Sequence, residues 1–298
     1  MQQAATVSRA PARAVVASYI NLMKPHVTVL LLGTALAAMA VASNGHLPFA
    51  ATLATLVGGA LAAGSANAIN CYWDRDIDQI MTRTRSRSLP AGRVQETHAL
   101  IFGLTLGALS VATYSVFVNL LSASLAFAAI AFYVGVYTMW LKRTTPQNIV
   151  IGGAAGAVPV LIGWAAVTNS IGWAAVWMFL IIFFWTPPHF WAVSLVLKND
   201  YARAGVPMLP VVKGERETHR QIVIYTVVLI AVSLGLFAGH FMGWLYLVSA
   251  LVLGAILLAY SINLARVRTL KSARTLFWIS NNYLAVLFAA MVLDRIFH

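Results

Sequence analysis

Residues 49–78, FAATLATLVGGALAAGSANAINCYWDRDID, indicate the class of fold to which the chain belongs. Residues 49–72 carry no charged side chain, and a run of about 20 apolar residues is long enough to cross a lipid bilayer as an α-helix. Three aspartates, Asp74, Asp76 and Asp78, follow the run directly. Because charged groups are costly inside a bilayer, this pattern predicts a membrane helix that carries a polar site at one end.

The composition of the whole chain excludes a soluble enzyme. Of its 298 residues, 60% are hydrophobic and 9% are charged, whereas soluble domains carry about 25% charged residues. The 20 Lys and Arg residues outnumber the 8 Asp and Glu residues, which gives a net charge of +12. In so apolar a chain we interpret the basic residues as signals of membrane topology, and we expect no nucleic-acid partner. The single cysteine, Cys71, excludes a disulfide framework and a cysteine-based zinc site.

Apolar runs long enough to span a bilayer follow one another along the whole sequence. They predict an all-α polytopic membrane protein of nine transmembrane helices, in which residues 1–17 form a mobile tail and residues 18–298 a single domain. The predicted spans are 19–42, 49–72, 98–118, 123–141, 148–168, 174–197, 221–239, 243–264 and 275–293.

The distribution of Lys and Arg predicts the orientation of these spans. If the N-terminus is cytoplasmic, every cation except Arg295 falls in a cytoplasmic segment, and the short outer loops hold none. Because cytoplasmic loops of membrane proteins are enriched in Lys and Arg, we expect the N-terminus inside and the C-terminus outside. We therefore expect a multi-pass protein of the bacterial cytoplasmic (inner) membrane, with its active site facing the cytoplasm.

Two of the expected inner loops, residues 73–97 and 198–220, are long and contain every acidic residue except Asp294. They also suggest a weak internal repeat, because the spacing from Pro25 to Pro146 nearly equals the spacing from Asp78 to Asp200. We therefore expect two four-helix halves, residues 19–141 and 148–264, followed by a ninth helix over residues 275–293.

The first of these loops begins with a strip of carboxylates and amides. On a helix that turns 100° per residue, Asn67, Asn70, Asp74 and Asp78 fall within a strip about 80° wide, whereas Asp76 points away and is expected to pair with an arginine. Neighbouring carboxylates repel each other, so the strip requires a cation. Oxygen ligands without histidine or thiolate favour Mg²⁺, which we expect on Asn70, Asp74 and Asp78.

Arginines follow the strip directly, in the stretch RTRSRSLPAGR over residues 83–93. Guanidinium groups beside a magnesium site fit an anionic substrate that also contacts the metal, such as a diphosphate. Arg83 and Arg87 are candidates to hold it, and the alternative for any single arginine here is a role in membrane orientation. For Arg85 and Arg93, the alternative that they only set membrane orientation is equally open.

The sixth span ends in FFWTPPHFW, residues 183–191, where two consecutive prolines are expected to interrupt the helix. Inside a membrane such an interruption is tolerated where the freed backbone groups line a cavity. His189 is therefore expected just beyond the break, either facing a flat hydrophobic ligand or bonding between helices. The aromatic side chains expected to line that cavity are Tyr137, Trp185, Phe190 and Trp191.

The second polar loop and the ends of neighbouring spans offer further charged groups for a diphosphate. Asp200 is the one carboxylate of the loop before Glu215, and the glycine and prolines of residues 205–210 predict a defined turn after it. The residues expected to complete the diphosphate site are Lys142, Arg143, Lys198, Asp200 and Arg203.

With these residues in view, the sequence resembles the UbiA superfamily of membrane prenyltransferases, and within it most closely the haem O synthase branch. The matching stretches are residues 67–93, 141–159, 185–191 and 200–210, which spread across most of the chain. The resemblance implies nine helices around a central cavity that is capped by the two polar loops.

The resemblance also implies a reaction, in which a farnesyl group passes from farnesyl diphosphate to a vinyl group of haem b and water adds to give haem O. It implies Mg²⁺ as the cofactor and the lipid bilayer as the surroundings, with haem A synthase or a terminal oxidase as partners for the product. One departure is the single Asp200, where most of the superfamily has several aspartates. This departure leaves two alternatives open, a second Mg²⁺ or the neighbouring cations in its place. The positions that match the first Asp-rich motif and the polar residues associated with activity are Asn67, Asn70, Asp74, Asp78, Arg83, Arg87 and His189.

Two other functions remain open from the residues alone. One is a related enzyme that prenylates an aromatic acid in quinone synthesis, which the single Asp200 and the double proline disfavour. The other is a transporter or haem-handling protein without catalysis, since transporters also use broken helices and polar sites at the midplane. The clustering of acidic residues at one membrane face favours an enzyme, and the absence of a Ser-His-Asp or Cys-His arrangement favours chemistry without a protein nucleophile.

Overall fold

A computed structural model describes residues 11–297 of the chain, and over this range it contains helices and no strands. Nine helices of the described part are long and apolar enough to cross a membrane, as the sequence predicted. They are α2 (Pro25–Ala42), α3 (Phe49–Trp73), α5 (Glu96–Phe117), the continuous segment of α6 (Leu120–Ala131), η1 (Phe132–Leu141) and α7 (Lys142–Thr144), α8 (Asn148–Thr168), α9 (Trp173–Val196), α12 (Gly214–Ala238), α13 (Trp244–Val267) and α14 (Leu270–Phe297). The short helices are α1 (Ala12–Leu22), α4 (Arg75–Ile80), α10 (Lys198–Arg203) and α11 (Leu209–Val212).

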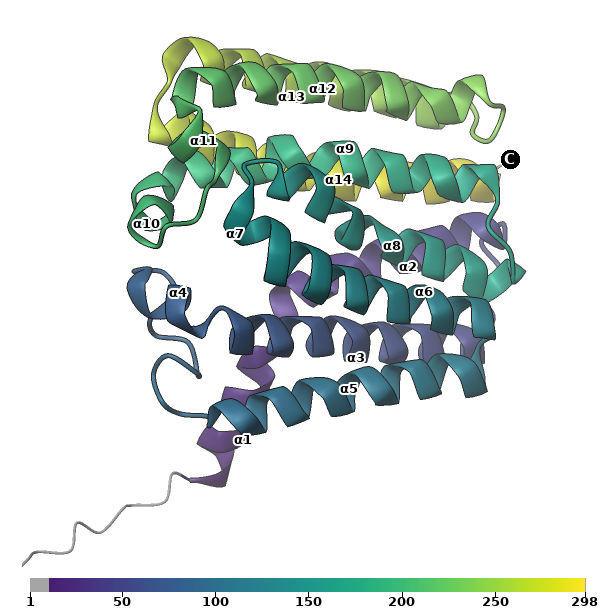
Figure 1. Cartoon of the computed structure of the whole chain (residues 1–298). Helices are drawn as coiled ribbons and strands as arrows, with labels where there is room; N and C mark the ends of the chain where they lie inside the picture. The colour runs from purple at the N-terminus through teal and green to yellow at the C-terminus, as the bar shows by residue number, and fades with distance from the viewer. Residues whose placement is uncertain (1–10, 298) are drawn as a thin grey trace, which may run out of the picture.

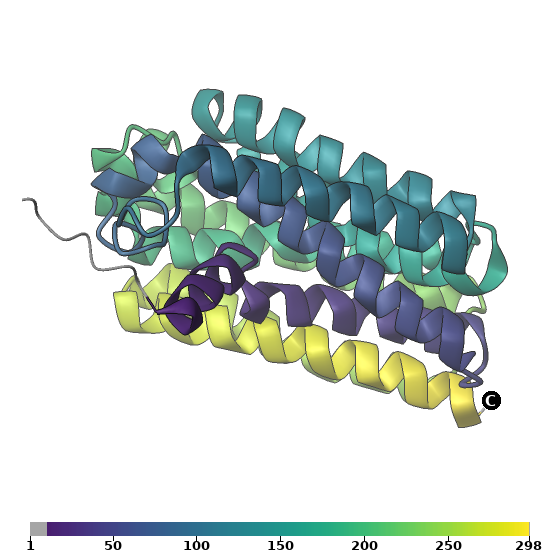
Figure 2. The ribbon, with the colours of Figure 1, turned by 90° about the horizontal axis from the view of Figure 1, so that it is seen from below.

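The long helices run side by side as a single bundle, and the short helices gather at one end of it (Figure 1). Helices α4, α10 and α11 lie together at that end, whereas the end of α14 lies at the other. Seen from below, α14 lies alongside α2, so that the last span closes against the first (Figure 2). The two long polar loops are therefore at one end of the bundle. The side of the membrane on which this end lies stays a prediction. The division of the chain into two four-helix halves also stays a prediction.

The core of the bundle is built around α9. This helix packs against α8, α12 and α14, and buried side chains such as Met178, Leu229 and Leu287 form one continuous cluster there. Large apolar side chains also cover the outside, where Phe49 and Trp173 are 82% and 73% exposed. An apolar exterior of this kind is what a lipid environment favours.

Small residues bring some helices unusually close. The Cα of Gly163 in α8 lies against the backbone carbonyl of Ala35 in α2, so that no Cβ fits between the two helices. In α3, a Cβ on Gly58 would come within 2.8 Å of the Tyr114 ring of α5. Membrane helices associate through close packing of this kind, because lipid tails give no hydrophobic drive between them.

The first predicted span, residues 19–42, is two helices. Lys24 has φ +50° and separates α1 from α2, which begins at Pro25. The residue before a proline is disfavoured in the α conformation, and proline suits the first position of a helix, so the break falls where it does for a local steric reason. Of the expected N-terminal tail, residues 1–10 lie outside the described residues, and the chain is helical from Ala12 onward.

The prediction that the double proline interrupts the sixth span is wrong. Helix α9 runs through Pro187 and Pro188 to Val196, with both prolines buried. The two missing N–H donors are tolerated because α8, α12 and α14 pack around the segment and hold it in place. His189 therefore lies within a continuous helix.

Candidate active site

The strip of carboxylates begins at the junction of α3 and α4. Asp74 lies between the two helices with φ −88° and ψ 8°. The Asp78 N–H still donates to the backbone carbonyl of Asp74 at 2.8 Å, so the helical register continues from α3 into α4. Asp74 and Asp78 are 1% and 2% exposed. The Asp76 side chain is 60% exposed. The helix therefore turns two carboxylates into the protein and one out of it, as the 100° turn per residue requires.

Asn70 links this strip to two other segments of the chain. Its Nδ2 donates to Asp74 Oδ2 at 2.7 Å and to Thr138 Oγ1 at 3.2 Å. Its Oδ1 accepts from Lys24 Nζ at 2.9 Å. Asn67 instead donates to the carbonyl of Met23 at 3.1 Å, which fastens α3 to the break between α1 and α2.

Two of these partners, Lys24 and Thr138, were not among the predicted site residues. Lys24 was counted only as a topology signal, although its position directly before Pro25 at the start of a span marks it as a basic residue at the level of the site. Burial lowers the pKa of Lys24, with the charges of Arg87 and Lys142 adding to the effect and those of Cys71 and Asp78 opposing it. The half-buried ammonium of Lys24, which bonds to Asn70 of the strip, is therefore part of the site.

Thr138 reaches Asn70 because the fourth span is not a regular α-helix at its inner end. Residues Phe132–Leu141 form a π-helix, where the sequence predicted an ordinary α-helical span. In this segment the Tyr133 and Tyr137 rings lie 5.3 Å apart between centroids. Such wide turns are rare and occur frequently at functional sites, and nothing in the period of apolar residues distinguishes them from α-helix.

Cations hold both buried carboxylates. Lys142 Nζ bonds to Asp74 Oδ2, and Arg143 Nη2 lies 3.5 Å from Asp74 Oδ1. Arg87 Nη1 lies 2.7 Å from Asp78 Oδ2. Removing one partner of a buried ion pair leaves an uncompensated charge. Loss of one of these cations would therefore destabilise the carboxylate that it contacts.

Arg143 also binds the exposed carboxylate. Its Nη1 and Nη2 each donate to Asp76 at 2.8 Å. The hydrogen bonds from Arg143 lower the pKa of Asp76 to about 2, against a smaller opposing effect of burial. Asp76 therefore stays ionised and holds Arg143 beside Asp74.

The second polar loop contacts the first through Asp200. This side chain accepts from the backbone N–H of Arg83 at 3.3 Å and from the Arg203 guanidinium, and Arg203 also donates to Thr82 Oγ1 at 2.6 Å. Burial alone raises the pKa of Asp200, but the hydrogen bonds from Arg203, Arg83 and Thr82 outweigh it and lower the pKa. The apolar residues beneath this contact are Ile77, Met81, Tyr201, Val206 and Met208.

Some predicted diphosphate residues lie elsewhere. Lys198 pairs with Glu215 at 2.8 Å, and within the described residues it forms no hydrogen bond or ion pair with Asp200. The Arg83 side chain is exposed, so that only its backbone takes part in the loop contact.

The aromatic residues around His189 do not line a single cavity. The His189 ring lies between Trp185 and Phe277, with centroid distances of 4.2 and 4.5 Å, and its Nδ1 bonds to Ser280 Oγ at 2.8 Å. Phe190 is 38% exposed. Trp191 packs edge-on against Tyr225 of α12, with ring centroids 5.2 Å apart. The consecutive residues 189–191 thus point to different sides of α9.

The residues of the strip fit a hard divalent cation. Asp74 Oδ1 is buried and accepts no hydrogen bond from the described residues, and its ion-pair partner Arg143 Nη2 is 3.5 Å away, so this oxygen retains capacity to coordinate a cation. The strip supplies only oxygen ligands from Asn70, Asp74 and Asp78, the chemistry that Mg²⁺ prefers. Within residues 11–297 no group of three His, Cys, Asp or Glu side chains is arranged to bind a metal, so the amide of Asn70 is needed in this set.

Comparison with known proteins gives the family. Residues 31–285 match the model of the UbiA prenyltransferase family. The chain is 53% identical to the protoheme IX farnesyltransferase of Gloeobacter violaceus, over 94% of this chain and 92% of that protein. It is also 53% identical to the protoheme IX farnesyltransferase of Symbiobacterium thermophilum, over 94% of each chain.

Solved structures agree on the fold. A structure of digeranylgeranylglyceryl phosphate synthase superposes with a TM-score of 0.79 at 18% identity, covering 95% of this chain and 99% of the other. A UbiA homologue from Archaeoglobus fulgidus, bound to GPP and Mg²⁺, superposes with a TM-score of 0.65 at 16% identity, covering 92% and 99%. With its nine membrane helices and its buried carboxylate strip, the chain belongs to the UbiA family of membrane prenyltransferases.

Proposed function

We propose that the protein transfers the farnesyl group of farnesyl diphosphate to a vinyl group of haem b, with addition of water, to give haem O and diphosphate. Relatives about half identical over nearly the whole chain are protoheme IX farnesyltransferases. The observation in the structure that best supports the proposal is the buried strip of Asn70, Asp74 and Asp78, which is bordered by Lys24, Arg87 and Lys142.

The strip would hold Mg²⁺ through Asn70, Asp74 and Asp78. When bound, the metal supplies positive charge that neutralises a diphosphate and so favours its departure. The homologue from Archaeoglobus fulgidus was solved with Mg²⁺ and GPP, which supports the same pairing of metal and prenyl diphosphate here.

The cations of the site act on the leaving group. Lys142 and Arg87 each contact a carboxylate of the strip, so a diphosphate placed there meets an ammonium and a guanidinium whose donors suit phosphate oxygens. The bond between farnesyl C1 and the diphosphate oxygen breaks, and the electron pair leaves with the diphosphate. Donors fixed before the reaction stabilise that developing charge without reorganisation.

The remaining bonds form between the substrates. The vinyl π electrons make the new bond to farnesyl C1, which leaves a cation on the carbon next to the porphyrin. Water adds to that carbon and releases a proton to solvent, which gives the hydroxyethylfarnesyl arm. This sequence uses no protein nucleophile, and shielding by the helices protects the allylic cation from premature quenching.

We also propose that the site faces the cytoplasm of a bacterium with this protein in its inner membrane. The positive-inside distribution of Lys and Arg supports this orientation. Because the product is a modified haem too apolar to leave the bilayer freely, a haem A synthase or a terminal oxidase in the same membrane is the proposed recipient.

The test is turnover by purified full-length protein given farnesyl diphosphate, haem b and Mg²⁺, read as haem O by mass and as released diphosphate. Asp74→Ala should lower the rate at least about 100-fold, because it removes a proposed ligand of the Mg²⁺ that would stabilise the charge on the departing diphosphate. Glu96→Ala, which removes an exposed carboxylate that pairs with Arg75 outside the strip, is the matched control and should keep most of the rate. Haem O formation at the wild-type rate by Asp74→Ala, or in excess chelator, would exclude the metal site. Prenylation of an aromatic acid with no haem product would exclude the haem substrate.

A further inference from the structure

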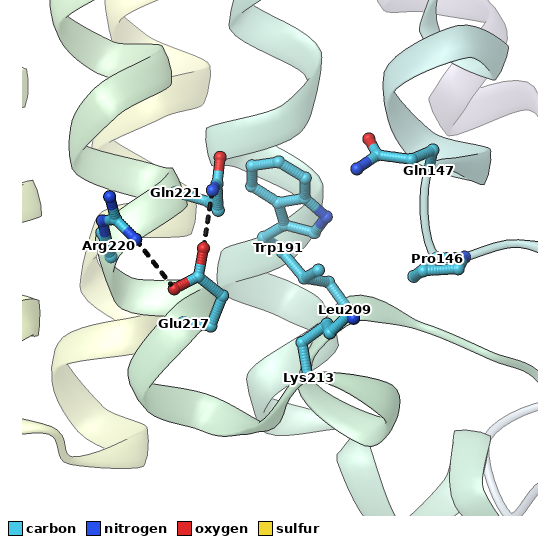
Figure 3. A pocket seen from close by; sticks show the side chains of 8 residues that line it. All are labelled: Pro146, Gln147, Trp191, Leu209, Lys213, Glu217, Arg220 and Gln221. Atoms are coloured by element: carbon cyan, nitrogen blue, oxygen red, sulfur yellow. Dashed lines mark hydrogen bonds and ion pairs between the residues drawn. The ribbon is translucent and has the colours of Figure 1, made fainter.

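A second polar site is lined by α9, α11, α12 and the turn before α8, and it shares no lining residue with the carboxylate strip. It is an open pocket of about 490 Å³ between the start of α8, the end of α9 and the first turns of α12. The side chains that matter for its chemistry are Gln147, Trp191, Lys213, Glu217, Arg220 and Gln221 (Figure 3).

The pocket carries an excess of positive charge. Glu217 accepts from Gln221 Nε2 at 2.7 Å and pairs with Arg220 at 3.5 Å. An adjoining pocket is lined by Lys213, Arg216, Glu217 and Arg220, and the other nearby acid, Glu215, is bonded to Lys198. Lys213 and Arg216 are exposed and have no carboxylate partner among the described residues. One carboxylate therefore faces three cations.

A buried donor in the same pocket has no acceptor. Trp191 is 1% exposed, and its Nε1 has no hydrogen-bond partner within residues 11–297. In Figure 3 the indole nitrogen is turned toward Gln147 and away from the pair of Glu217 and Arg220. Indole nitrogen can only donate, and leaving a buried donor unpaired costs free energy. An oxygen acceptor bound beside it would remove that cost.

The pocket lies on another side of α9 from His189. Trp191 follows His189 by two positions, so the two side chains project about 200° apart around α9. His189 packs on Phe277 of α14, whereas Trp191 packs on Tyr225 of α12. A ligand in the pocket therefore occupies the opposite face of α9 from His189.

An apolar strip continues from the pocket along the outside of α12. Ile224 and Val227 follow Arg220 at positions i+4 and i+7, on the same helical face, and are 41% and 50% exposed. The site thus presents cations at the polar end of a span and uncovered aliphatic side chains directly along it. That order matches an amphiphile with an anionic head and an acyl chain.

We propose that this pocket binds the phosphate group of an anionic phospholipid, whose acyl chain lies along Ile224 and Val227. Basic pockets between membrane helices near the membrane surface recognise anionic head groups in this way. Lys213, Arg216 and Arg220 supply the charge, and Trp191 Nε1 supplies a directed hydrogen bond. Tryptophan is also the side chain that membrane proteins place at head-group level.

The test is native mass spectrometry of the full-length protein released from detergent that contains equal amounts of phosphatidylglycerol and phosphatidylcholine. Wild-type protein should retain phosphatidylglycerol at least about fivefold more than phosphatidylcholine. The double variant Lys213→Gln with Arg220→Gln should lose this preference. Trp191→Phe, which removes the N–H donor together with part of the indole ring, should reduce it by half or more. The matched control is Arg266→Gln with Lys271→Gln, which removes the same charge from exposed positions outside the pocket and should retain the preference.

Each contrary outcome rejects the proposal in a different way. Equal loss in the control pair would mean that retention follows net charge. Displacement of the lipid by millimolar inorganic phosphate would assign the pocket to a free anion, and displacement by haem b would assign it to the carboxylates of the substrate. Because the readout is the mass of retained lipid, it does not depend on whether the protein farnesylates haem.

Discussion

The backbone N–H of Arg83 donates to Asp200 Oδ2 at 3.3 Å, although the two residues are 117 positions apart. Arg203 strengthens the contact by bonding to both Asp200 and Thr82. The two polar loops that the sequence singled out therefore meet above the ends of the spans, and one carboxylate joins them.

Replacing Asp200 by Asn should loosen this junction. A hydrogen bond to a charged group contributes about 1.5–3 kcal/mol, so amide hydrogen exchange in residues 82–88 should speed up by roughly tenfold or more. The measurement is hydrogen exchange by mass spectrometry in detergent. Glu215→Gln, which breaks the exposed pair with Lys198, serves as the control and should leave these amides unchanged. Equal exchange in Asp200→Asn and wild type would show that the loops are held by their apolar contacts alone.

The ion pair of Asp76 and Arg143 should titrate far below neutrality. The pKa of Asp76 is lowered from 3.8 to about 2 by the hydrogen bonds from Arg143. A lowered pKa in the folded state stabilises the protein above pH 3.8, and this stabilisation is lost as the pH falls through about 2. Carbon-13 NMR of labelled aspartate should give a midpoint near pH 2. Arg143→Gln should return the midpoint toward 3.8, whereas Arg93→Gln, an exposed arginine bonded to the Ser86 carbonyl, should not.

Lys142→Met should reduce turnover by about 100-fold, because it removes a fixed positive charge beside the leaving group and leaves Asp74 with the more distant Arg143. Lys142→Arg should recover part of the rate. The measurement is kcat and KM for farnesyl diphosphate. Lys271→Met, at an exposed position, is the control for the loss of one charge. A rise in KM with unchanged kcat would mean that Lys142 binds substrate without acting on the departing diphosphate.

His189→Phe should separate the structural role of His189 from its chemical role. Phenylalanine preserves stacking between Trp185 and Phe277 but cannot bond to Ser280. We expect a loss of about 1 kcal/mol in stability. Because His189 matches a position associated with activity in the haem branch that the sequence resembles, we also expect a much larger loss of haem O formation. Thermal unfolding and turnover are measured on the same sample. Turnover that falls only in proportion to the folded fraction would make His189 a packing residue.

The sequence was sufficient to predict the membrane spans because the bilayer imposes a length of about 20 apolar residues on each span, and polar loops separate the spans clearly. The inward turn of Asp74 and Asp78, and the outward turn of Asp76, follow from the helical period alone. These features depend on neighbours within one segment of chain. They were therefore open to prediction from a single sequence.

Contacts between segments were not open to prediction in the same way. The bond from Lys24 to Asn70 depends on the break before Pro25, and the bond from Asn70 to Thr138 depends on the π-helix of the fourth span. Composition does not distinguish a π-helix from an α-helix. The prediction of a break at the double proline was wrong because it used the effect of proline on an isolated helix. Helix α9 stays continuous because the neighbouring helices pack against it.

Helix α14 ends at the face of the bundle remote from α4 and α10 (Figure 1), and its 28 residues extend over about 42 Å at 1.5 Å per residue. Asp294, near this end, accepts from the backbone N–H groups of Gly243 and Tyr246 and so caps the start of α13. A fluorophore or an immobilisation tag attached beyond Asp294 will therefore lie at the opposite end of the bundle from α4 and α10, where it does not contact the carboxylate strip.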